Sequence, residues 1–92
     1  MFEITDRPIE LARLQSAVGH PAAGAIVTFV GTTRNANAGR RVIRLEYEAF
    51  ATMAEKEMRR LATAARKRWP LRRVAMAHRI GVVPVGEASV GI

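Results

Sequence analysis

The fold is decided by residues 52–70, which read TMAEKEMRRLATAARKRWP. Apolar side chains recur there every three or four residues, and this spacing predicts an amphipathic helix with one buried stripe. Thr52 and Glu55 have the spacing of a capping box at its start, and Pro70 stops it. The predicted buried stripe consists of Ala54, Met58, Leu61, Ala65 and Trp69, and the predicted solvent face of Lys56, Arg59, Arg60, Thr63 and Lys67.

Segments with the alternation of a half-buried β-strand lie on both sides of this helix, at residues 41–49 and 72–80. Alternation with a period of two places every second side chain on the same face of a sheet. The side chains predicted to point inward are Ile43, Leu45, Tyr47 and Ala49 in the first segment, and Val74, Met76, His78 and Ile80 in the second.

The remaining segments complete the predicted order of elements. Residues 24–33 are β-branched and almost wholly apolar, which is typical of a central strand. Residues 2–5 form a possible short edge strand, and a helix capped by Thr5 or Asp6 follows it and ends at Gly19. After a break at Gly81 and Pro84, residues 88–92 begin a last strand. The order β-α-β-β-α-β-β predicts one α+β domain over residues 1–92, with both helices on one side of a mainly antiparallel sheet.

The composition excludes several kinds of chemistry. The chain has 92 residues and no cysteine, so we expect no disulfide, no thiolate nucleophile and no sulfur-ligated metal. Two histidines without ligand spacing predict no metal site. The longest apolar stretch is too short to span a bilayer, and the N-terminus lacks the pattern of a signal peptide. A cytoplasmic location is therefore expected.

The charge is strongly basic, with 15 Lys and Arg against 8 Asp and Glu, a formal net charge of +7. A basic surface favours anionic partners such as phosphorylated small molecules, acidic proteins or nucleic acid. A nucleic-acid interface on the predicted helix would need aromatic side chains for base stacking, and the basic stripe contains none. Glu55 and Glu57 also interrupt it, so a solvated face is the favoured interpretation.

The strongest candidate for a binding site is the sequence FVGTTRNANAG at residues 29–39. It leaves an apolar strand and enters a polar loop, and Gly31 lets another backbone approach closely. Thr32 and Thr33 offer hydroxyl and N–H groups, and the guanidinium of Arg34 suits phosphate or carboxylate. The loop is thus predicted to bind an anion. The alternative is that Arg34 is a solvated loop residue and the asparagines only turn the chain.

Other polar residues have structural interpretations. His78 lies on the inward side of its predicted strand, which favours a hydrogen-bonded core histidine, and His20 beside Pro21 is expected in a loop. Glu46 and Glu48 share a face and could form paired carboxylates, but Arg44 on the same face favours a salt-bridged surface.

Several motifs together resemble the family of the molybdopterin synthase large subunit. The loop FVGxxRNxNxG is similar to the signature loop of that family. The resemblance continues through nearly all of the chain, ending at the position of Ile92 with the last part of the family fold missing. It is carried further by LEYEAF at 45–50, MAE at 53–55, RWPL at 68–71, HRIG at 78–81 and GEASV at 86–90.

The resemblance implies an α/β hammerhead fold and an enzyme that is a heterotetramer. Two large subunits would form a central homodimer, and each would bind the C-terminal tail of a ubiquitin-like small subunit. That tail carries a thiocarboxylate, from which sulfur passes to cyclic pyranopterin monophosphate to form the dithiolene of molybdopterin. No cofactor is implied, because the partner supplies the sulfur.

By position, Thr32, Thr33 and Arg34 match the substrate-binding stretch of the family's signature loop. The family's other active-site elements, a His-Arg pair and two lysines, lie beyond the position of Ile92 and have no counterpart here. His78-Arg79 is an earlier and different pair. No catalytic residue is therefore assigned within the chain, and we expect it to be inactive alone. The alternatives are an inactive dimerising remnant and a small basic nucleic-acid-binding domain.

Overall fold

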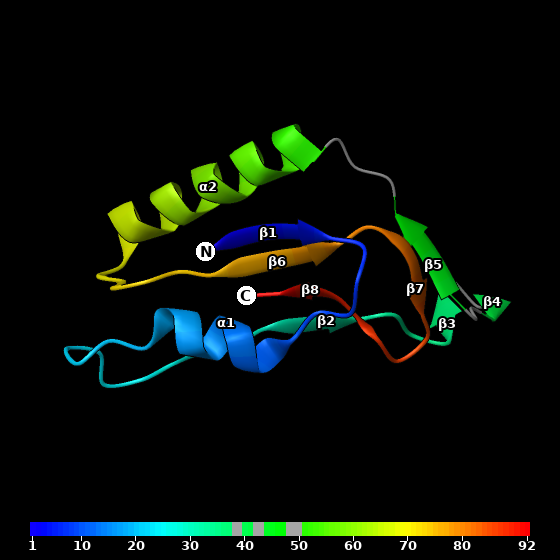
Figure 1. The fold of residues 1–92 in the computed structure, drawn as a ribbon, viewed down its shortest axis with the longest axis horizontal. Coiled ribbons are helices and arrows are strands. Elements are labelled where there is room, and N and C mark those ends of the chain that lie inside the picture. The colour runs from blue at the N-terminus through cyan, green and yellow to red at the C-terminus, as the bar shows by residue number, and fades with distance from the viewer. Residues whose placement is uncertain (38–39, 42–43, 48–50) are drawn as a thin grey trace.

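The centre of the protein is a four-stranded mixed sheet with the order β1-β6-β8-β2 (Figure 1). The structure is a computed structural model that describes residues 1–37, 40–41, 44–47 and 51–92. Strand β1 pairs with β6 in parallel, whereas β6 with β8 and β8 with β2 are antiparallel. This confirms the α+β class and the mainly antiparallel sheet. The four strands are β1 (Phe2–Thr5), β6 (Met76–Arg79), β8 (Ala88–Gly91) and β2 (Val30–Thr32).

Two short antiparallel ladders gather at one end of the molecule (Figure 1). One joins β3 (Ala36–Asn37) to β4 (Arg40–Arg41), and the other joins β5 (Arg44–Tyr47) to β7 (Gly81–Pro84). The predicted strand at 41–49 is thus present in part. Its side-chain alternation, including the face shared by Arg44, Glu46 and Glu48, lies outside the described residues.

The helices are α1 (Leu11–Val18) and α2 (Ala51–Arg68), and they contact opposite faces of β1. Glu3 forms an ion pair with Arg13 of α1, whereas the ring of Phe2 lies under the guanidinium of Arg59 of α2. Successive residues of a strand point to opposite faces. The prediction that both helices lie on one side of the sheet was therefore wrong.

Small side chains allow α1 to pack closely on the sheet. Leu14 is buried against Ala75 and Ala77. A Cβ atom at Gly91 would lie only 2.7 Å from Cδ1 of Leu14, so a larger residue there would push the helix away. Gly19 ends the helix as predicted, although its φ of −57° and ψ of 131° are values that other residues also adopt, and its φ is not positive.

The predicted cap of α1 was wrong. The helix begins at Leu11, and its N-cap residue, Glu10, makes no side-chain capping bond. Thr5 is still paired with Arg79 in the sheet, and its hydroxyl accepts a hydrogen bond from the N–H of Arg7 at 3.1 Å. The chain therefore turns after β1 before the helix can start.

The predicted central strand at 24–33 was also wrong, because only Val30–Thr32 form β2, and β2 is an edge of the sheet. Ile26 and Val27 are 52% and 90% exposed. Toward the N-terminus the pairing of β2 with β8 extends only to the reciprocal backbone bonds between Phe29 and Ile92, and residues 24–28 make no strand pairing with the described residues.

The buried stripe of α2 is narrower than predicted. Ala62 is buried, whereas Leu61 and Trp69 are exposed. The helix packs mainly on β1, an edge strand, so it buries little more than one line of side chains. Lys56, Arg60 and Lys67 are exposed as predicted. The helix begins at Ala51, so Thr52 is inside it and is not its cap.

Strand β6 is covered on both faces, unlike the half-buried strand predicted at 72–80. Ala75, Met76 and Ala77 are all buried, and β6 itself spans only Met76–Arg79. A strand with a neighbouring strand on each side and a helix near each face has no face open to solvent, so apolar and polar residues need not alternate along it.

We expect Ala62→Leu to destabilise the protein by about 1–3 kcal/mol, because the added atoms have no space under α2. Ala64→Leu is the matched control on the exposed side of the same helix, and it should change the free energy of unfolding by less than about 0.5 kcal/mol. Urea melts of both variants measure the difference. Equal losses would contradict the orientation of α2.

Candidate functional site

The predicted anion loop begins where β2 leaves the sheet. The register between β2 and β8 shifts between Gly31 and Thr32, which ends regular pairing at this point. A Cβ atom at Gly31 would lie 2.6 Å from Cγ1 of Val90. The atom that approaches Gly31 so closely belongs to the side chain of Val90, and not to a backbone as predicted.

Thr33 is held between two backbone hydrogen bonds. Its N–H donates to the carbonyl of Glu87 at 3.1 Å, and its own carbonyl accepts from the N–H of Gly86 at 2.8 Å. Gly86 has a φ of +85°, a value that favours glycine, and the turn closes through the N–H of Glu87 and the carbonyl of Pro84. Thr33 is 2% exposed, so it positions the loop and offers no free surface to a ligand.

A buried arginine, missed by the sequence analysis, supports this turn. Arg79 was expected on the outward side of its strand, but it is only 8% exposed and donates to Oε1 of Glu87 at 2.8 Å. Nε of Arg79 and the hydroxyl of Thr33 are buried with no partner among the described residues. The opposite charges of Arg79 and Glu87, eight residues apart across β7, were the signal that could have revealed the pair.

Thr32 and Arg34 lie on either side of the buried Thr33, and both are exposed. Of the three predicted site residues, Thr33 is therefore buried and fixes the loop, and Thr32 and Arg34 have side chains that a ligand can reach. Arg34 also interacts within the protein. An exposed guanidinium on an anchored loop can bind an anion with little further ordering of the backbone.

The two histidines have the structural roles predicted for them. Nδ1 of His78 lies 3.0 Å from the carbonyl of Ser89, in a partly buried position between β6 and β8. Nδ1 of His20 accepts a hydrogen bond from the N–H of Ala22 at 2.9 Å, in the loop after α1. No group of residues that could hold a metal ion occurs in the part of the chain that the structure describes.

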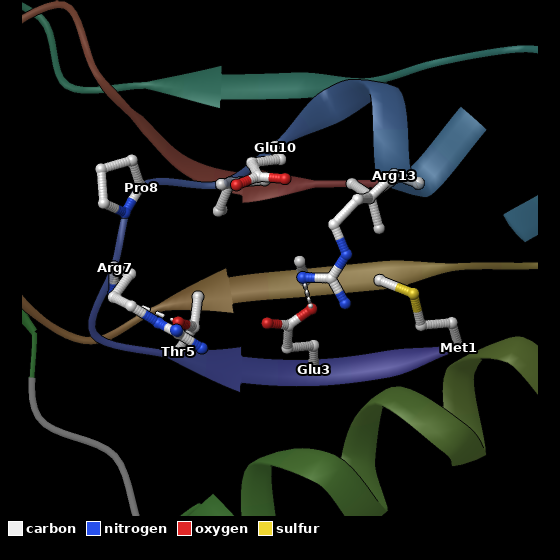
Figure 2. A pocket seen from close by; sticks show the side chains of 10 residues that line it. Met1, Glu3, Thr5, Arg7, Pro8, Glu10 and Arg13 are labelled. Carbon is white, nitrogen blue, oxygen red and sulfur yellow. Dashed lines mark hydrogen bonds and ion pairs between the residues drawn. The ribbon is translucent and has the colours of Figure 1, made fainter. Parts of the chain in front are cut away.

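A cavity of about 280 Å³ lies between β1 and the start of α1, apart from the loop (Figure 2). Figure 2 shows Arg13 reaching from the helix toward Glu3 on the strand, and these two form an ion pair at 3.4 Å. Arg7 and Glu10 also line the cavity, so both signs of charge are present. Thr32, Thr33 and Arg34 are absent from its lining, and it is not the predicted anion site.

The basic face of α2 is partly neutralised by its own glutamates. Glu55 pairs with Arg59 at 2.8 Å, and Glu57 pairs with Arg60 one turn along. The hydrogen bond from Arg60 lowers the pKa of the Glu57 carboxyl. This favours the solvated face predicted above over a nucleic-acid interface. No helix within the described ranges is long and apolar enough to cross a membrane.

Residues 4–92 match the family described as MoaE protein. The chain belongs to this family. It is similar to the molybdopterin synthase catalytic subunit of Rattus norvegicus, with 44% identity over 89 residues, and to that of Bos taurus, with 46% identity over 90 residues. These matches cover 97% and 98% of the chain but only 44% and 48% of the two relatives. The chain thus spans about half the length of these MoaE relatives.

Solved structures of MoaE proteins share the fold. The structure of molybdopterin synthase from Staphylococcus aureus matches with a TM-score of 0.91 at 31% identity, covering 98% of this chain and 66% of that one. A MoaE protein from Burkholderia ambifaria matches with a TM-score of 0.84 at 30% identity, covering 98% and 59%. The family resemblance drawn from the signature loop and the expected hammerhead-like α+β fold are both confirmed.

We expect Gly31→Ala to destabilise the protein by about 1–3 kcal/mol, because the new methyl group would collide with Val90. Gly24→Ala is the matched control, since nothing lies within 4 Å of a Cβ atom there, and its effect should stay below about 1 kcal/mol. Denaturant melts compare the two variants. If Gly31→Ala were as harmless as the control, the close contact of β2 with β8 would be refuted.

Proposed function

We propose that this chain acts as a large-subunit component of molybdopterin synthase, in the biosynthesis of the molybdenum cofactor. One observation carries the proposal: the family's signature loop leaves the sheet at a clamped residue, Thr33, and presents Arg34 beside it at the surface. The S. aureus relative of similar fold is itself named molybdopterin synthase.

The proposed substrate is cyclic pyranopterin monophosphate. Arg34 offers a planar fork of donors that fits a phosphate or carboxylate in two places at once. The hydroxyl of Thr32 is exposed next to the same loop and can add a neutral hydrogen bond. Thr33 acts through its two backbone hydrogen bonds, which fix the position of the loop relative to the sheet.

The proposed sulfur donor is the thiocarboxylated C-terminal tail of a ubiquitin-like small subunit. The chain contains no cysteine, so sulfur has to arrive on another molecule. Its net charge of +7 favours an anionic tail and an anionic pterin alike. The proposed assembly is the heterotetramer of the family, with two large subunits as a central homodimer, in the cytoplasm.

No convergent set of catalytic groups is present in the part of the chain that the structure describes. Its two lysines, Lys56 and Lys67, are exposed on α2, and His78 is bound within the sheet. Sulfur transfer needs groups that move protons and stabilise developing charge near the acceptor carbon. We therefore propose that turnover requires groups from outside these 92 residues.

Two alternative functions remain in the proposal. A dimerising remnant would bind partners without turnover, and the exposed apolar residues Ile26, Val27 and Phe29 favour such a surface. A nucleic-acid-binding domain would show affinity that falls steeply with salt. The ion pairs along α2 argue against this second alternative.

We expect Arg34→Ala to weaken binding of cyclic pyranopterin monophosphate by ~1.5–3 kcal/mol, the usual contribution of a charged hydrogen bond. The protein to use is a hybrid in which the rest of the S. aureus relative completes the chain. Lys67→Ala removes one exposed charge from α2 and controls for general electrostatics. Calorimetric titration measures both affinities, and an unchanged affinity for Arg34→Ala would refute the assignment.

The 92-residue chain should form no dithiolene when mixed with the thiocarboxylated small subunit and the pterin, because the lysines and His78 within the described residues are held away from Arg34. The hybrid should be active in the same assay. Turnover by the short chain at the rate of the hybrid would mean that its catalytic groups lie within residues 1–92. An inactive hybrid that still binds both partners would favour the dimerising remnant.

A further inference from the structure

The ion pair of Arg79 with Glu87 starts a chain of contacts that ends at Arg34. The guanidinium of Arg79 donates to Oε1 of Glu87 at 2.8 Å, and Arg79 is only 8% exposed. Within the described residues Glu87 is its one ion-pair partner, and its Nε is buried without a hydrogen bond. Moving the Glu87 carboxylate away would leave a buried charge uncompensated, which is costly. The pair therefore holds the Glu87 side chain in one place.

The backbone of Arg79 has a fixed position in the sheet. Arg79 is paired with Thr5 of β1, and the N–H of Ile80 donates to the carbonyl of Thr5 at 2.8 Å. On the other side of β6, His78 is paired with Val90 of β8. A strand bonded on both sides belongs to the part of a protein that opens least. The guanidinium of Arg79 is thus attached to a firm base.

The turn that Arg79 holds also supplies both groups that bind the backbone of Thr33. The N–H of Gly86 donates to the carbonyl of Thr33 at 2.8 Å, and the carbonyl of Glu87 accepts from the N–H of Thr33 at 3.1 Å. The register of β2 with β8 shifts one residue earlier, so these two bonds set where Thr33 lies. Figure 1 shows this turn, between β7 and β8, beside the end of β2.

We propose that Arg79 is a positioning residue for the anion that Arg34 binds. Arg79 holds Glu87, the turn at Gly86 and Glu87 holds Thr33, and Arg34 is the next residue. The side chain of Arg79 is 10% exposed, so it acts through Glu87 and does not touch the ligand. It orders the loop before the anion arrives, which lowers the entropy lost on binding. The inference rests on the proposed function, because it takes this loop as the anion site.

A purely structural role for the pair leads to a different expectation. Removing one partner of a buried ion pair leaves an uncompensated charge, whereas replacing both partners by uncharged groups is often neutral for stability. The double variant Arg79→Met with Glu87→Gln removes both charges and keeps the net charge of the chain. If the pair served stability alone, this variant would bind an anion as tightly as the parent chain does.

The test titrates the 92-residue chain with inorganic phosphate and follows the Nε–H resonance of Arg34 by NMR. In the double variant the phosphate affinity should fall about fivefold, the factor expected when the backbone of one residue has to be ordered on binding. Hydrogen exchange at the Thr33 amide should become faster in the same variant. Glu87→Gln alone keeps an oxygen acceptor for Arg79, and it should shift both measurements in the same direction if the double variant does not fold.

The matched control removes an exposed ion pair from α2 by combining Arg60→Met with Glu57→Gln. It also keeps the net charge, and it should leave both measurements unchanged.

A folded double variant with the phosphate affinity of the parent would overturn the proposal, and so would an equal loss in the control. If Arg34 of the parent chain did not respond to phosphate, the anion site itself would be refuted, and this proposal with it. A fall in phosphate affinity in the double variant, with no binding of the pterin by the hybrid, would refute the proposed substrate and leave Arg79 as a positioning residue.

Discussion

Strand β8 holds the sheet together because it is hydrogen-bonded on both sides, to β6 and to β2. Without β8, the pair β1 and β6 would have no backbone hydrogen bonds to β2. Its close packing rests on missing side chains: Gly91 lies directly beneath α1, and Gly31 of β2 lies against Val90. A methyl group at either place would separate layers that now touch, and a close-packed interior does not absorb such a change without strain.

The candidate site depends on this same strand. The turn before β8 supplies both groups that clamp Thr33, and the carboxylate of Glu87 in that turn is held by Arg79 from β6. The loop that carries Arg34 is thus positioned by β2 together with β6 and β8, which follow much later in the chain. Fixing the backbone in advance lowers the entropy lost when an anion binds.

The spacing of apolar and turn residues predicted those elements that depend on neighbours in the sequence. The helix at 51–68, the edge strand at 2–5 and the exposed Arg34 loop follow from periodicity, turn residues and the family motif. The errors came from contacts between different elements of the fold. In α2, Ala62 is buried and Leu61 is exposed, because the helix packs against a single edge strand that covers only a narrow part of its surface. Arg79 is buried because Glu87 meets it across a turn, which alternation along one strand cannot reveal.

The parallel pairing of β1 with β6 has a consequence for how the protein is made. Phe2 pairs with Met76, and the N-terminal amine bonds to the carbonyl of Val74, 73 residues along the chain. A contact this distant closes late, because a long loop has to be ordered before the contact forms. During synthesis the first strand therefore leaves the ribosome with no partner, and its Phe2 and Ile4 side chains stay open to chaperones until β6 has been translated.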